Sequence, residues 1–187
     1  GLFGKNSTNG FELYRATSFN NQLRGNLLAQ YFISDLWSVD LNADGTGVDE
    51  IVSLSTVING NLGSTLDVLT GPGGVVIGVD LQDDLLSFAI PDELGITGVT
   101  AYDIFPWRAP AVGGSQFVIG GINFSGDLTD TAVSIGGEIA TLTDVSDSRI
   151  RGIIPDLTGQ PSDLLDVVIQ SAGQTSVIAD AFLPLIA

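Results

Sequence analysis

The stretch "AVSIGGEIATLTDVSDSRIRGIIPDL", residues 132–157, decides the fold of this chain. Gly136 and Gly137 follow a short apolar run, and glycine tolerates the positive φ angles of a tight hairpin turn. Pro155 follows a second apolar run, and because proline has no N–H to donate, it ends strand pairing there. The stretch therefore predicts short β-strands joined by a hairpin and ended by a proline.

Similar patterns fill most of the remaining chain. Residues 50–58 ("EIVSLSTVI") alternate as a half-buried strand does, and residues 73–81 ("GGVVIGVDL") and 116–124 ("QFVIGGINF") are short apolar runs next to glycines. No segment keeps a helical 3.6-residue period for more than about ten residues. Many short strands separated by frequent turn residues predict an all-β fold of the sandwich class.

The sequence also contains a repeat. The tripeptide Ile-Pro-Asp stands at 90–92 and again at 154–156, 64 positions apart. Gly73-Gly74 matches Gly136-Gly137 at nearly the same offset, and Asp80 matches Asp144. An ordered series of matches predicts a tandem duplication, whereas the alternative is that two unrelated segments use the same turn chemistry.

The second copy resembles the IPT/TIG family of immunoglobulin-like domains over about residues 109–185. Four features support this resemblance: Gly121-Ile122-Asn123-Phe124 after an apolar strand, Ile135-Gly136-Gly137, the corner from Ile150 to Pro155, and the hairpin of Val167-Val168-Ile169 with Gly173. The first copy, about residues 48–108, resembles a degenerate version, with Leu62 where the family has Phe. The resemblance implies β-sandwich modules of a multidomain extracellular, surface or assembly protein, and occasionally of a glycan-associated one.

Three parts of the chain are expected. Residues 1–38 form an N-terminal arm or extra layer, residues 39–108 a degenerate immunoglobulin-like domain, and residues 109–187 the IPT/TIG-like domain. The fold class is therefore tandem immunoglobulin-like β-sandwiches with an N-terminal arm. The arm contains Lys5, Arg15 and Arg24, half of the six basic residues of the chain. We expect these three side chains to contact an acidic partner.

Composition excludes several classes of function. The chain has 22 acidic and 6 basic residues, and a net charge of −16 repels nucleic acids and anionic membrane surfaces. It contains no His and no Cys, so a Ser-His-Asp triad, a Cys nucleophile and thiolate metal sites are impossible within it. The sequence contains no run of 18 apolar residues, so we expect no membrane-spanning helix. We therefore expect no catalytic residues and no enzymatic activity.

Residues 40–50 ("DLNADGTGVDE") provide the strongest signal for a cofactor. Oxygen ligands at alternate positions, followed by a glycine, match the first half of a calcium loop. The candidate Ca²⁺ ligands are Asp40, Asn42, Asp44, Asp49 and Glu50. The match is incomplete, because position 12 of such a loop is Ile51 and Glu50 stands one position early. The alternative is a solvated turn between strands.

Residues 102–110 ("YDIFPWRAP") concentrate aromatic side chains beside an arginine. Such sets form interface hot spots and platforms for sugars, so Tyr102, Phe105, Trp107 and Arg108 are candidate partner contacts. Two prolines in the same stretch also fit a stiff, packed linker between two domains.

Three hypotheses of function remain. The first is a non-enzymatic structural or assembly protein of a particle or cell exterior: a virion decoration or tail component, or a subunit of a surface layer or filament. Its partners would be further copies of the chain or capsid, tail or surface proteins, and its location a virion, the extracellular space or a cell surface. The second is a calcium-assisted adhesion or glycan-binding module. The third is an accessory domain of a larger extracellular enzyme.

Overall fold

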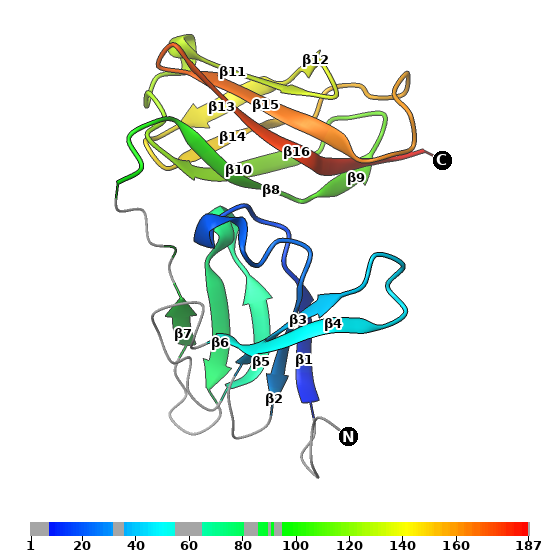
Figure 1. Ribbon diagram of the computed structural model, residues 1–187. Coiled ribbons are helices and arrows are strands. Elements are labelled where there is room, and N and C mark those ends of the chain that lie inside the picture. The colour runs from blue at the N-terminus through cyan, green and yellow to red at the C-terminus, as the bar shows by residue number, and fades with distance from the viewer. Residues whose placement is uncertain are drawn as a thin grey trace. The chain divides into compact units, whose positions relative to one another are not determined.

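The computed structural model describes residues 8–31, 36–54, 65–80, 86–89, 91 and 95–186. The chain divides into two compact units, Gly1–Asp92 and Glu93–Ala187 (Figure 1). The described residues form strands, turns and short 3₁₀ segments only, which confirms the all-β prediction. Within these same ranges, no helix is long and apolar enough to cross a membrane.

The first unit consists of two antiparallel sheets. One has the order β1-β2-β3-β4 and the other the order β5-β6-β7. The strands are β1 (Thr8–Leu13), β2 (Leu27–Tyr31), β3 (Leu36–Leu41), β4 (Val48–Ser53), β5 (Thr65–Thr70), β6 (Val76–Asp80) and β7 (Leu86–Ala89). β1 and β2 lie within residues 1–38, the stretch expected to form an N-terminal arm or an extra layer, and they hydrogen-bond into the same sheet as β3 and β4.

A buried tyrosine fixes the N-terminal segment within this unit. The Tyr14 hydroxyl donates to the Gly74 carbonyl at 2.6 Å and lies 2.5 Å from Ser18 Oγ. Gly74 belongs to the 3₁₀ segment Pro72–Gly74, which follows β5. The contact therefore joins residues 60 positions apart, and it explains why residues 14–18 pack as part of the unit instead of extending from it.

Two adjacent glycines in this segment provide a matched test of that contact. Gly73 and Gly74 both have positive φ, +81° and +74°. A Cβ on Gly73 would meet nothing within 4 Å, whereas one on Gly74 would overlap Ser18 Oγ and lie 2.5 Å from Tyr14 Oη. Because both variants share the backbone strain, we expect Gly74→Ala to destabilise the first unit by about 1–3 kcal/mol more than Gly73→Ala. Urea unfolding of both variants measures the difference, and equal losses would contradict the contact.

The second unit is a sandwich of two sheets, with the orders β13-β14-β10-β8 and β12-β11-β15-β16-β9 (Figure 1). Its first five strands are β8 (Thr100–Phe105), β9 (Arg108–Pro110), β10 (Gln116–Ile122), β11 (Thr131–Ile135) and β12 (Glu138–Ile139). The remaining four are β13 (Thr141–Val145), β14 (Arg149–Ile153), β15 (Leu165–Ser171) and β16 (Gln174–Leu185). Side chains from both sheets form one core, including Phe117, Ile119, Ile150, Val167 and Phe182.

The turns that the sequence predicted are present in this unit. Gly136 and Gly137, both with positive φ, join β11 to β12 as a two-residue hairpin loop. Gly173 also has positive φ and joins β15 to β16. Asn123 follows β10 with a positive φ, but its Nδ2 donates to the carbonyls of Ile96 and Gly98, 27 and 25 positions away, so the amide ties this turn to the segment before β8 and does not close the turn itself. Pro155 follows the end of β14.

The boundary between the units lies earlier than the 108/109 boundary expected from the sequence. β8 pairs with β10, with Ile104 opposite Ile119, so residues 100–105 belong to the second unit. The chain then crosses to the other sheet, where β9 pairs in parallel with the end of β16. The stretch that was expected to link two domains is therefore the place where one strand changes sheets within a single domain.

The proposed repeat has one counterpart in the structure. β6 and β7 form an antiparallel pair followed by Pro91, and β13 and β14 form an antiparallel pair followed by Pro155. The preceding strands differ: β5 pairs with β6, whereas β11 pairs with β12 and β15 in the sheet that does not contain β13. Ile90 and Asp92 lie outside the described residues, and the duplication stays a prediction.

Candidate functional site

The predicted calcium loop is the hairpin between β3 and β4. Asn42 Oδ1 accepts a hydrogen bond from the Gly47 amide at 2.9 Å, and the backbone of the same two residues also pairs. Asp44 Oδ1 accepts from the Thr46 amide at 3.0 Å and from its hydroxyl at 2.6 Å. Asp40 and Glu50 lie directly opposite each other on the two strands. Asp49 is the extra residue at the bulge beside this pair.

The bonds around Asp44 recur at two other turns. Asp127 Oδ1 accepts from the Thr129 amide and hydroxyl, and Asp156 Oδ1 accepts from the same two groups of Thr158. In each case the threonine hydrogen bonds lower the pKa of the aspartate carboxyl below its usual value. A carboxylate held in this way stabilises a turn without any metal.

This comparison favours the solvated turn over the calcium loop at residues 40–50. In the described parts of the chain, no group of three or more acidic side chains is placed to hold a metal ion. Calcium binding by Asp40, Asn42, Asp44, Asp49 and Glu50 stays a hypothesis, to be decided by titration.

Titration with Ca²⁺ separates the two interpretations. A hairpin closed by its own hydrogen bonds predicts no saturable heat and no shift of the unfolding midpoint at millimolar Ca²⁺. A calcium loop predicts a saturable rise of the midpoint, because a ligand that binds only the folded state stabilises it. The rise would also have to disappear in Asp44→Ala, and that pair of results would overturn the turn interpretation.

Two of the three basic side chains predicted as partner contacts in the N-terminal segment lie in the described structure. Lys5 lies outside the described residues. Arg15 and Arg24 are half-buried, and both interact with other groups of the chain. Their contact with an acidic partner stays a prediction.

The four residues predicted as partner contacts in residues 102–110 have different environments. Tyr102 is buried in the second unit, with 4% of its surface exposed. The Arg108 guanidinium stacks on the Trp107 ring, with its carbon 4.9 Å from the ring centroid. Phe105 is 60% exposed. Of the four, Phe105 is therefore the side chain most available for a partner on its own.

Phe105 lies at one end of a groove on the second unit. The groove has a volume of about 720 Å³ and is lined by residues of β8, β10, β13 and β14 and by Pro106. Register places a row of four residues across these strands: Phe105 lies opposite Val118, Val118 opposite Arg151, and Arg151 opposite Asp144. Opposed residues share a face of a sheet, so the row runs from an aromatic ring through an aliphatic side chain to two charges.

Residues 100–182 match the family model of the IPT/TIG domain. These residues form an IPT/TIG domain. The match confirms the resemblance seen in the sequence, and it begins at β8, the first strand of the second unit. No curated protein matches the chain.

Several solved structures are similar to parts of the chain. A putative phosphatase from Bacteroides thetaiotaomicron is 18% identical, with a TM-score of 0.37, covering 48% of this chain and 18% of that one. An auxiliary nutrient binding protein from Bacteroides ovatus is 22% identical, with a TM-score of 0.36, covering 48% and 20%. The plexin A4 extracellular region is 13% identical, with a TM-score of 0.43, covering 99% and 16%. The chain thus spans a fifth or less of these proteins' lengths.

Sequence reasoning did not select most of the groove of the IPT/TIG domain. Val118, Asp144 and Arg151 were not candidates, because they meet only when strands distant in the sequence pair. One signal was available in "SRIRGI", residues 148–153, where two arginines alternate with Ile150 and Gly152. Alternation of this kind places both cations on the outer face of one strand.

Proposed function

We propose that the chain is a non-enzymatic module that assembles on the exterior of a virion or a cell. The observation behind the proposal is the IPT/TIG domain of residues 100–182, because immunoglobulin-like domains of this kind generally mediate contacts between proteins. The absence of His and Cys from the whole sequence is consistent with a binding role.

An apolar sheet face in the first unit supports assembly. Leu69 lies opposite Ile77 and Ile77 opposite Phe88, and in the next row Val79 lies opposite Leu86. Residues two apart on a strand share a face, so all five side chains lie on one side of this sheet. Phe88 and Leu86 are 55% and 56% exposed. Contiguous apolar surface of this kind is typical of protein interfaces.

The charge of the chain shapes how it would assemble. A net charge of −16 makes two copies repel each other, and salt screens that repulsion. The apolar face, in contrast, is insensitive to screening. Self-association should therefore strengthen as the salt concentration rises, unlike association that depends on ion pairs.

Sedimentation velocity of the full chain over a range of concentrations and salt tests the proposal. We expect reversible association that strengthens with salt and is weakened in Phe88→Ser, because that change replaces an aromatic ring of the apolar face that is 55% exposed with a polar side chain. The control is Ile139→Ser, which removes an apolar side chain that is 78% exposed in the IPT/TIG domain and should leave association unchanged. A chain that stays monomeric under every condition would contradict self-assembly.

A second candidate function, a saccharide-binding adhesion module, is favoured by the groove beside Phe105. It rests on different residues from the assembly face, so the two functions are separable by mutation.

A further inference from the structure

We propose that the groove on the outer face of sheet β13-β14-β10-β8 binds a short oligosaccharide that includes one carboxylate-bearing sugar. The sugar ring would lie on Phe105 and its carboxylate on Arg151. This inference concerns the IPT/TIG domain alone and does not depend on self-assembly through the first unit.

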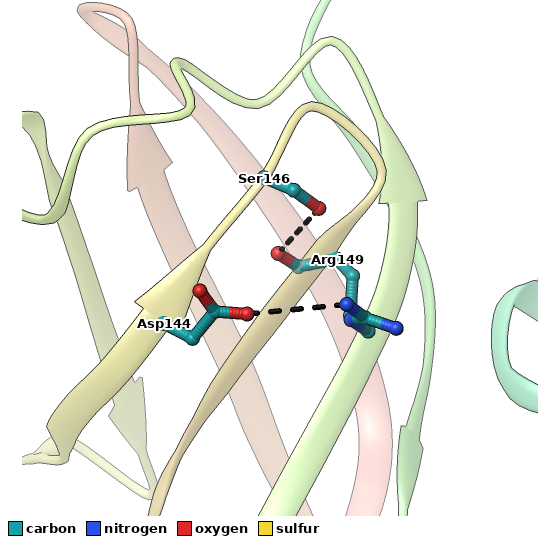
Figure 2. A network of polar contacts seen from close by, with 3 residues as sticks. All are labelled: Asp144, Ser146 and Arg149. Atoms are coloured by element: carbon teal, nitrogen blue, oxygen red, sulfur yellow. Dashed lines mark hydrogen bonds and ion pairs between the residues drawn. The ribbon is translucent and has the colours of Figure 1, made fainter.

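Arg151 and Asp144 lie opposite each other but do not form an ion pair. Asp144 lies opposite Arg151 in the register, yet its carboxylate is directed diagonally to Arg149, with an N–O distance of 4.0 Å (Figure 2). The Arg149 carbonyl in turn accepts bonds from the Ser146 amide and hydroxyl, which close the hairpin. No ion pair or hydrogen bond joins the Arg151 guanidinium to another described residue.

The charges of Arg151 and of the whole chain limit which anion the groove can bind. Arg151 presents a planar fork of donors, which matches a carboxylate in two parallel hydrogen bonds. The surrounding chain has a net charge of −16, so a densely charged polyanion would be repelled from the domain. A single carboxylate flanked by neutral groups can pair with the Arg151 guanidinium, and it carries too little negative charge to be repelled as a polyanion would be.

The groove runs across the strands of the sheet. It crosses four strands, a span of about 14 Å at the usual spacing between strands. An extended peptide binds by adding to the free edge of a sheet, where backbone groups are unpaired. The backbone groups of β10 and β14 already pair on both sides, so a ligand in the groove meets side chains.

The groove places an aromatic ring beside polar side chains. Phe105 is 60% exposed and Val118 beside it is half-buried, so together with Pro106 they give the groove an apolar part that includes one exposed flat ring. Gln116 and Thr143 add an amide and a hydroxyl. A flat ring next to a few donors and acceptors suits a sugar, which has an apolar C–H face and hydroxyl groups around its edge.

Isothermal titration of the full chain with two probes tests the proposal. One probe is a trisaccharide with a central glucuronate between neutral sugars, and the other is the same trisaccharide with the carboxylate reduced to an alcohol. We expect the wild type to bind the acidic probe at least about tenfold more tightly, the gain typical of a hydrogen bond to a charged group. Arg151→Gln should remove that preference, and the control Arg108→Gln, which removes an arginine of the same domain outside the groove lining, should retain it.

Phe105→Ala should weaken both probes a few-fold, because the ring contacts the part that they share. If the alanine variant does not fold, Phe105→Leu replaces it in the test, because leucine keeps most of the apolar volume but has no flat ring. Any of three results would overturn the proposal: no binding of either probe at millimolar concentration, equal affinity for both, or affinity unchanged in Arg151→Gln. Binding of an acidic extended peptide in place of the sugars would also overturn it, in favour of a peptide ligand.

Discussion

The packing of Phe117 on Gly152 sets the register between β10 and β14, and the outer face of the IPT/TIG domain depends on that register. Phe117 lies directly opposite Gly152, and a Cβ at Gly152 would lie 2.6 Å from the Phe117 ring and 2.6 Å from the Thr141 carbonyl. The ring therefore fills space that only a glycine leaves open. Because side chains alternate along a strand, a slip of one residue would turn Val118 and Arg151 into the core.

This register also separates the two kinds of surface in the domain. Phe117 and Ile119 of β10 and Ile150 of β14 face the core, while Arg149 and Arg151 of β14 face outward. Of the three basic residues in the second unit, two thus share the face with the groove. Elsewhere in the domain, acidic side chains such as Asp127 and Asp156 bind backbone and hydroxyl groups of their own turns. The outer face therefore carries both arginines of β14 together with Asp144, in a chain whose net charge is −16.

The sequence predicted the features that depend on local chemistry. Gly136-Gly137 and Pro155 could be assigned to turns because backbone freedom and a missing N–H act over a few residues. The all-β class followed from the same signals. The Asn123 amide, in contrast, bonds to Ile96 and Gly98, 27 and 25 positions away. The family resemblance placed the start of the second sandwich at about residue 109, whereas the first strand of that unit, β8, begins at Thr100.

Features that depend on distant pairing were not predictable in the same way. The assignment of β8 to the second unit rests on its ladder with β10, and no local pattern distinguishes it from the end of a preceding domain. The contact between Tyr14 and Gly74 joins residues 60 positions apart, so the N-terminal segment gave no local sign that it packs within the first unit. The groove has the same origin, since Phe105 and Arg151 meet only through the strand between them.

A double-mutant cycle between Phe117 and Gly152 tests the central claim most directly. Free energies of unfolding would be measured for Phe117→Leu, Gly152→Ala and the double variant. If the ring occupies the space above the glycine, Gly152→Ala should be strongly destabilising alone and less so when Phe117 is already Leu, with a coupling of about 1 kcal/mol or more. Additive effects of the two substitutions would show that this contact does not set the register, and would contradict the account of the outer face.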